Sequence, residues 1–144
     1  MKTYRLHHNL EFDITRSVPD MAALFAYYPA TGEEADVILK VAFQDGSFTA
    51  ILEKDGALWK SAPVICDELV SGEVSRCVKL AVLDAFTQMT GQAVELPWGI
   101  LTGVRPGKLA HKLVDGGTSF ALLPNYLQEK YLLPAEQAQM LTNI

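Results

Sequence analysis

The sequence predicts an α+β domain: a mostly antiparallel sheet in β-α-β-β-β order, covered by a long amphipathic helix and followed by a cluster of short C-terminal helices. Three observations support this prediction. Strand-like segments between residues 37 and 65 are joined by two Asp-Gly turns. An apolar stripe at helical spacing runs from Val74 to Met89. Glycines and prolines divide the last third of the chain into short segments.

The first two elements are a strand and a helix. Residues 2–8 alternate loosely between polar and apolar side chains, which indicates a strand. Ser17 is a suitable N-cap residue and Pro19 suits a first helical turn, so we predict a helix over residues 18–28. Pro29 and Gly32 end that helix.

Three strands then form an antiparallel meander. Residues 37–43 and 48–52 are rich in β-branched and aromatic side chains and flank the Asp45-Gly46 turn. After a second Asp-Gly turn, residues 58–65 form the third strand of the meander. Pro63 places part of this third strand at an edge of the sheet, because proline cannot donate to a ladder of hydrogen bonds.

A long helix is predicted from about residue 68 to residue 90, with Gly91 as its cap. Its charged and polar residues are expected to face away from the core, and its length lets it lie across the whole sheet. The residues expected to face away are Glu73, Arg76, Lys79, Asp84 and Gln88. The apolar stripe consists of Val74, Cys77, Val78, Ala81, Val82, Ala85, Phe86 and Met89.

The C-terminal third reads as short helices. One begins at Pro106 and runs to Val114, and the last covers residues 135–141. We predict a sheet-and-helix body over residues 1–95 and a helical extension over residues 96–144, together forming one compact domain. Because the last helical pattern is cut off at Asn143-Ile144, we expect the natural protein to continue.

Composition narrows the class of protein. With 49% hydrophobic and 20% charged residues, the sequence is typical of a globular protein. A net charge of −5 argues against broad nucleic-acid binding or binding to acidic membranes. No apolar run has the length of a membrane span, and no apolar segment of a signal peptide follows the first basic residues. These features predict a cytoplasmic protein with no membrane partner.

No metal site or catalytic residue is predicted within the chain. Cys66 and Cys77 are eleven positions apart, which favours two buried thiols of a reduced protein over half of a metal site. His7 and His8 are adjacent and would point to opposite faces of a strand, so they favour solvent-facing residues over metal ligands. His111, alone on a short helix, is interpreted as a surface residue and not as a general base.

A nucleotide-hydrolysing phosphate loop is excluded by spacing. The segment that ends at Lys108 has Thr102 where the loop requires glycine. The next residue is Leu109, which cannot ligate magnesium, and Pro106 lacks the backbone N–H that a phosphate cradle uses.

A looser anion-binding face remains a candidate. Arg105, Lys108 and Lys112 lie at i, i+3 and i+7 near the start of the helix that begins at Pro106. This face would hold a carboxylate, a phosphate or an acidic patch of another domain, although an ordinary solvated basic face is the favoured interpretation. Trp98, between Pro97 and Gly99, is interpreted as a plug on the core in preference to a stacking platform.

The stretch Trp98-Gly99-Ile100-Leu101-Thr102-Gly103-Val104-Arg105-Pro106, followed by Lys108 and by His111-Lys112, resembles a block in one family. The family is the oxygen-independent coproporphyrinogen III oxidase-like radical S-adenosylmethionine proteins, in the coproporphyrinogen dehydrogenase branch of Firmicutes. Tyr131-Leu132-Leu133 and the helix after it are similar to the family's next segment. Gly107 departs from the family pattern, which has threonine there.

The resemblance implies an N-terminal accessory domain of an enzyme of porphyrin and haem biosynthesis that oxidatively decarboxylates propionates. In such enzymes a CxxxCxxC loop of a downstream barrel holds a [4Fe–4S] cluster that binds S-adenosylmethionine. Since no such loop occurs in these 144 residues, the chain itself is expected to be non-catalytic and to hold no cofactor. Its expected partners are its own barrel domain and a tetrapyrrole or other carboxylate substrate.

A second hypothesis comes from another class of protein. The chain would be a free-standing module that binds RNA or a protein through Trp98 and the basic face around Arg105 and Lys108. The acidic net charge makes nucleic acid the weaker partner of the two.

Overall fold

The computed structural model describes residues 1–11, 14, 16–69, 71–92, 94, 125, 128–130, 132 and 134–142. The chain divides into two compact units, Met1–Val94 and Glu95–Ile144. Each unit is described by itself below.

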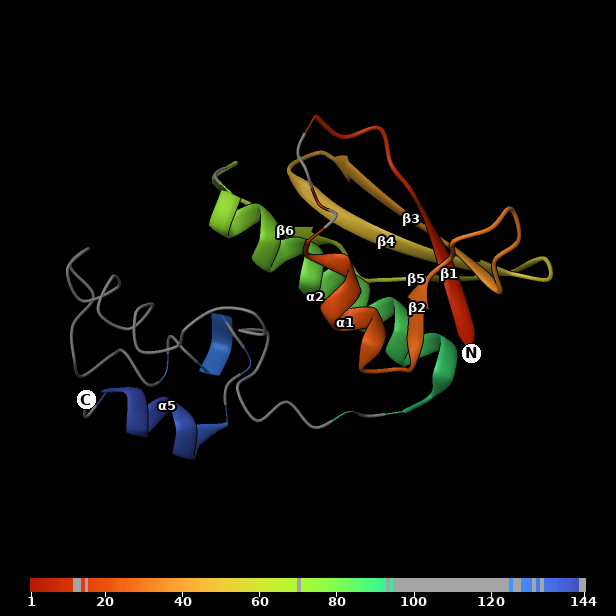
Figure 1. Cartoon of the computed structure of the whole chain (residues 1–144). Coiled ribbons are helices and arrows are strands. Elements are labelled where there is room, and N and C mark those ends of the chain that lie inside the picture. The colour runs from red at the N-terminus through yellow and green to blue at the C-terminus, as the bar shows by residue number, and fades with distance from the viewer. Residues whose placement is uncertain are drawn as a thin grey trace. The chain divides into compact units, whose positions relative to one another are not determined.

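The first unit is built on a mixed sheet of six strands in the α+β class (Figure 1). The strand order is β2-β1-β3-β4-β5, and β6 also pairs with β4. The strands are β1 (Lys2–His7), β2 (Tyr27–Pro29), β3 (Val37–Gln44), β4 (Ser47–Lys54), β5 (Ala57–Lys60) and β6 (Val64–Ile65).

The prediction of a mostly antiparallel sheet is wrong at β1, which pairs in parallel with both of its neighbours. Lys2 is opposite Tyr27 of β2, and Tyr4 is opposite Val37 of β3. The chain leaves β1 through helix α1 (Val18–Ala23) and returns as β2, and a crossover of this kind brings the second strand back in the same direction. The meander β3-β4-β5 is antiparallel as predicted.

Helix α1 is shorter than the predicted helix over residues 18–28. It ends at Ala23, and Ala26 has a positive φ of 61°, which reverses the chain direction. Tyr27 and Tyr28 then lie in β2, where they have high β propensity, although the sequence predicts a helix there. The helical pattern failed here because Tyr27 is buried through pairing with β1, a contact distant in sequence.

The predicted strand over residues 58–65 is broken into β5 and β6. Pro63 lies in the break, as expected for a residue with no N–H to donate. Two backbone N–H groups of the break are hydrogen-bonded: Ser61 N donates to Ala50 O at 2.8 Å, and Ala62 N donates to Asp84 Oδ2 at 2.7 Å. The strand therefore stays beside β4 on both sides of the break.

Both Asp-Gly turns have the backbone that the sequence predicts. Asp45 and Gly46 have φ values of 54° and 77°, and Asp55 and Gly56 have φ values of 51° and 83°. Two consecutive positive φ values are the signature of a type I′ hairpin turn. The two hairpins thus have the tight connections that fix the register of β3, β4 and β5.

We expect Gly46→Ala to lower the free energy of unfolding by about 1 kcal/mol, because a Cβ disfavours the left-handed region. Urea unfolding of the full chain measures this change. Gly32→Ala is the matched control, since Gly32 has no positive φ and open space around its Cα. An equal loss in both variants would contradict the argument from the turn.

Helix α2 (Ser71–Thr90) packs on the sheet together with α1, on the same side of it (Figure 1). Gly91 ends α2 with a φ of 69°, and its N–H donates to Thr87 O at 2.8 Å, as the predicted cap requires. The fully buried side chains between the helices and the sheet form the core: Met21, Leu39, Phe48, Leu52, Val78 and Phe86.

The predicted polar face of α2 is wrong at Arg76 and Lys79, which are only 8% and 6% exposed. Helix α1 packs against α2, and the Oγ of Ser17, just before α1, donates to Ser75 Oγ at 3.0 Å. Asp20 of α1 acts on Lys79 electrostatically and opposes the lowering of the Lys79 pKa by burial. Helix α1 thus lies near Lys79, a residue that the sequence pattern assigned to solvent.

In the second unit, the predicted last helix is confirmed as α5 (Ala135–Thr142). Ala138 N donates to Pro134 O at 3.0 Å, and Ala138 is buried. The short helix predicted from Pro106 lies outside the described residues.

Candidate functional site

The residues predicted to bind an anion or another domain lie outside the described part of the chain. They are Trp98, Arg105, Lys108 and Lys112, and His111 lies there too. Their predicted roles stay predictions, and the structure directs attention to two other places in the first unit.

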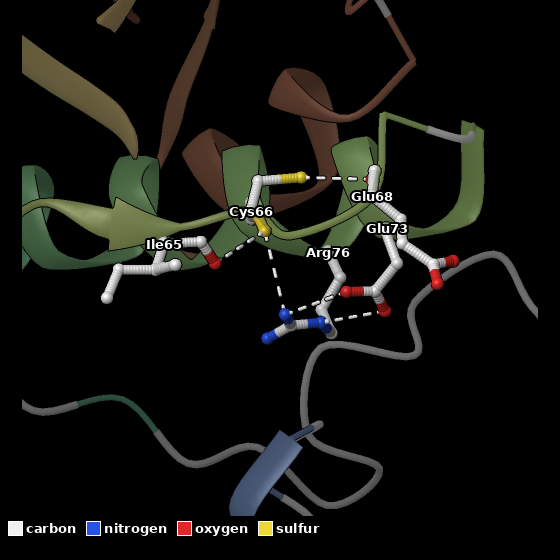
Figure 2. Close-up of polar contacts among 6 residues, drawn as sticks. Ile65, Cys66, Glu68, Glu73 and Arg76 are labelled. Atoms are coloured by element: carbon white, nitrogen blue, oxygen red, sulfur yellow. Dashed lines mark hydrogen bonds and ion pairs between the residues drawn. The ribbon is translucent and has the colours of Figure 1, made fainter. Parts of the chain in front are cut away.

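The first place is where the end of β6 meets α2, and the thiols of Cys66 and Cys77 contact each other there. Figure 2 shows Cys66 and Arg76 in this place. Cys66 follows β6, and its thiol donates to Glu68 O at 3.3 Å. Cys77 is on α2, and its thiol donates to Ile65 O at 3.5 Å. Both are buried free thiols, as predicted. Their proximity was missed because it depends on how β6 packs on α2.

The Cys77 thiol is held in its neutral form. Burial and a hydrogen bond with the Cys66 thiol raise the pKa of Cys77 to about 12, although the Arg76 guanidinium, whose Nη2 is 3.6 Å from Cys77 Sγ, acts in the opposite direction. Arg76 is itself paired with Glu73, through Nε to Oε1 at 3.2 Å and Nη2 to Oε2 at 3.0 Å (Figure 2). A thiol without thiolate character is a poor nucleophile, so this pair fits a structural role.

We expect neither cysteine to react with Ellman's reagent near neutral pH while the chain is folded, and both to react after unfolding in urea. The reason is that Cys66 and Cys77 are 5% and 0% exposed and the Cys77 pKa is raised. Because the unfolded thiol ionises near pH 9 and the folded one near pH 12, this group's contribution to stability should fall as pH rises through that window. Rapid labelling of one thiol in the folded chain would contradict the structural role.

The histidine pair shows no arrangement for binding a metal. His8 Nδ1 accepts a hydrogen bond from Leu10 N at 3.2 Å, and His7 is exposed at the end of β1. Among the described residues, no group of three or more His, Cys, Asp or Glu side chains is placed to hold a metal ion.

The second place is a hollow of about 290 Å³ at the C-terminal end of α2. Four of its lining residues come from the sheet: Lys2, Tyr27, Lys54 and Trp59. Lys2 is opposite Tyr27 in the β1-β2 pair. Trp59 is opposite Leu52, which is fully buried, so both side chains are on the helix-covered face of the sheet. Lys54 is two residues after Leu52 on β4 and therefore lies on the same face. All four therefore lie on the helix-covered face of the sheet, where that face extends past α2.

Helix α2 and the turn after α1 supply the other walls. Met89, Thr90 and Gln92 come from the end of α2, and Phe25 comes from the turn. Phe25 stacks on Phe86 with ring centroids 5.3 Å apart, so its orientation is fixed by the core. This rigid support distinguishes the hollow from a gap between surface side chains.

The charged groups that line this hollow are both cationic. Lys2 Nζ lies 5.5 Å from the centre of the Tyr27 ring, in a cation–π arrangement. Asp36 is the neighbouring carboxylate. A hydrogen bond from Thr3 N chiefly lowers its pKa, and Lys54 adds a weaker electrostatic effect. Within the described part of the chain, no ion pair involves either lining lysine. The site is thus locally positive in a chain of net charge −5.

Sequence reasoning missed this hollow because its residues come from five separate segments with no shared motif. Comparison of the chain with family models, with curated proteins and with solved structures finds no match. No helix in the described part of the chain is both long and apolar enough to cross a membrane.

Proposed function

We propose that this chain is the N-terminal accessory domain of a cytoplasmic radical S-adenosylmethionine enzyme that resembles oxygen-independent coproporphyrinogen III oxidase. The observation that carries the proposal is the sequence block from Trp98 to Pro106, with Lys108 and His111-Lys112 after it. The full-length enzyme would oxidatively decarboxylate propionate side chains in porphyrin and haem biosynthesis. The first unit, Met1–Val94, is a body of the size expected for an accessory domain.

The cofactors of this proposal belong to the downstream barrel and not to this chain. A [4Fe–4S] cluster needs cysteine thiolates, and the chain offers only Cys66 and Cys77. Burial and hydrogen bonding raise the pKa of Cys77 to about 12, so its thiol is protonated at neutral pH. These residues do not fit an iron–sulfur cluster, and the catalytic step is assigned to residues beyond this chain.

The accessory role is contact with the barrel. Arg105, Lys108 and Lys112 are spaced for one helical face, which suits an acidic patch of the barrel or the carboxylates of a substrate. Trp98 would bury its ring against the body at the start of the same block. The block then acts as the joint between the body and the catalytic domain.

The most direct test is to sequence the gene past codon 144. A CxxxCxxC motif within a few dozen codons is expected, because the cluster loop opens the barrel in enzymes of this kind. A stop codon directly after Ile144 would overturn the proposal. In that case, salt-dependent RNA binding that is lost in the Arg105→Ala and Lys108→Ala double variant would identify a free-standing module.

A biochemical test compares iron–sulfur cluster formation in this chain with that in the longer protein. After anaerobic reconstitution with iron and sulfide, the chain should show no stoichiometric cluster absorbance, whereas the extended protein should show it. A 4Fe signal in the chain alone would contradict the division of roles. The separately expressed barrel should also bind the chain, and Arg105→Ala with Lys108→Ala should weaken that binding roughly tenfold.

A further inference from the structure

We propose that the hollow at the end of α2 binds a small anion that carries a flat aromatic ring, with this ring against Trp59 and the anionic group between Lys2 and Lys54. This inference rests on the first unit alone and does not depend on the proposed function. Two sources share this chemistry, a nucleoside monophosphate and an aryl carboxylate, and the test below distinguishes them.

The size of the hollow limits the ligand. Small-molecule sites usually enclose about 300 to 1,000 Å³, and this one encloses about 290 Å³. A nucleoside monophosphate or an aryl carboxylate fits this volume, whereas a dinucleotide does not. The hollow is therefore suited to a small molecule and not to a large cofactor.

The aromatic walls favour a flat ligand. Trp59 is half-buried on the core face of β5, so one part of its indole is packed and another part faces the hollow. Tyr27 is 4% exposed and packs on Phe86 with ring centroids 5.2 Å apart. The Tyr27 ring therefore forms part of the wall, and the accessible part of the Trp59 indole is the surface on which a flat ring would stack.

The lysines favour an anion and indicate its position. Lys2 and Lys54 are both exposed, so their amines are hydrated and able to reach a ligand. The Lys2 amine retains hydrogen-bond donors for an anion while it lies over the Tyr27 ring.

The end of α2 sets the direction of the ligand. A helix C-terminus carries partial negative charge, so the anionic group is repelled from it and the ring is expected to lie on that side. Thr90 Oγ1 donates to Phe86 O at 2.8 Å, and Gln92 N donates to Thr90 Oγ1 at 3.2 Å. These bonds fix the polar wall that the end of α2 supplies, and the two lysines line the hollow from β1 and β4.

The test uses the full 144-residue chain labelled with ¹⁵N, with any affinity tag at the C-terminus so that Lys2 keeps its natural surroundings. The chain has two tryptophans, so the indole N–H signal of Trp59 is assigned by its loss in Trp59→Phe. AMP and benzoate are titrated separately, with adenosine and inorganic phosphate as ligands that lack the anion and the ring respectively. We expect a saturable shift of the Trp59 signal with AMP, with benzoate or with both, and at least roughly tenfold weaker binding of adenosine and phosphate.

Three charge variants test the position of the anion. Lys2→Gln and Lys54→Gln remove the charge and keep most of the stem, and each should weaken binding roughly fivefold. Lys60→Gln is the matched control, because Lys60 is opposite Ile51 and so lies on the other face of the sheet from Trp59. Its affinity should stay within about twofold of the parent chain. Binding should also weaken between about 50 and about 300 mM NaCl.

Each outcome decides the proposal. A response to AMP alone identifies a nucleotide, a response to benzoate alone identifies an aryl carboxylate, and a response to both supports the shared chemistry. No shift of the Trp59 signal with either ligand at about 10 mM would overturn the proposal. Equal binding of AMP and adenosine, or unchanged affinity in both lysine variants, would also overturn it.

Discussion

Phe86→Ala is expected to lower the free energy of unfolding by about 3 to 5 kcal/mol, the largest effect of any substitution considered. Phe86 is fully buried on α2 and packs on Phe25 and Tyr27, with ring centroids 5.3 and 5.2 Å away. It therefore joins α2 to the turn after α1 and to β2. Removing the ring leaves a cavity where three elements meet. The surrounding side chains belong to different elements and cannot all move in to fill that cavity.

Urea unfolding followed by circular dichroism measures this loss, with the slope of the transition as a check that folding stays cooperative. Gln88→Ala is the control, because Gln88 is exposed on the same helix and should change the stability by less than about 0.5 kcal/mol. A loss below about 1 kcal/mol for Phe86→Ala would mean that this aromatic group does not hold the three elements together. Since Phe25 and Tyr27 also line the hollow, the variant should weaken ligand binding there as well.

The parts of the fold that the sequence predicts correctly are those with local physical causes. The two Asp-Gly turns are visible because only a few residue types tolerate consecutive positive φ values. The end of α2 at Gly91 follows from the same conformational freedom. Strands β3 and β4, on either side of the first turn, alternate buried residues with half-buried or exposed ones, so their periodicity also reports their structure.

The parts that were predicted wrongly depend on contacts distant in sequence. Nothing in residues 2–8 shows that β1 has parallel neighbours on both sides, because the direction of a partner strand leaves no mark on the pattern. Tyr27 and Tyr28 fall within the predicted helix over residues 18–28, yet pairing with β1 places them in a strand. Arg76 and Lys79 have the composition of a solvated face, yet both are buried in the folded chain, and Lys79 interacts with Asp20 of α1, a residue distant in sequence.

The candidate site follows the same division. A motif such as the block from Trp98 to Lys108 can be recognised in sequence because its residues are consecutive. The hollow cannot be recognised in the sequence, because Lys2 and Trp59 are 57 positions apart and are brought to one site only by the sheet order β1-β3-β4-β5. The two cysteines are intermediate, since their burial was predicted and their mutual contact was not.

Ser61→Ala is expected to lower the free energy of unfolding by about 1 to 3 kcal/mol, the second-largest effect. Ala50 N on the central strand β4 donates to Ser61 Oγ at 2.9 Å, and Ser61 N donates to Ala50 O at 2.8 Å. The hydroxyl replaces a backbone acceptor at the point where the break before Pro63 interrupts the ladder. Both residues are buried, at 3% and 0% exposed, so water cannot take over the lost bond without opening the sheet.

Two measurements distinguish an unsatisfied backbone group from a general loss of packing. Urea unfolding gives the stability change, with Ser47→Ala at the half-buried start of β4 as the control, expected within about 0.5 kcal/mol of the parent. Hydrogen exchange followed by NMR should show the Ala50 amide losing more protection than the Leu52 amide two residues along the same strand. If the Ala50 amide stays as protected as Leu52 while stability is unchanged, another acceptor serves this N–H. The break between β5 and β6 would then not depend on the serine hydroxyl, and Pro63 alone would account for the split strand.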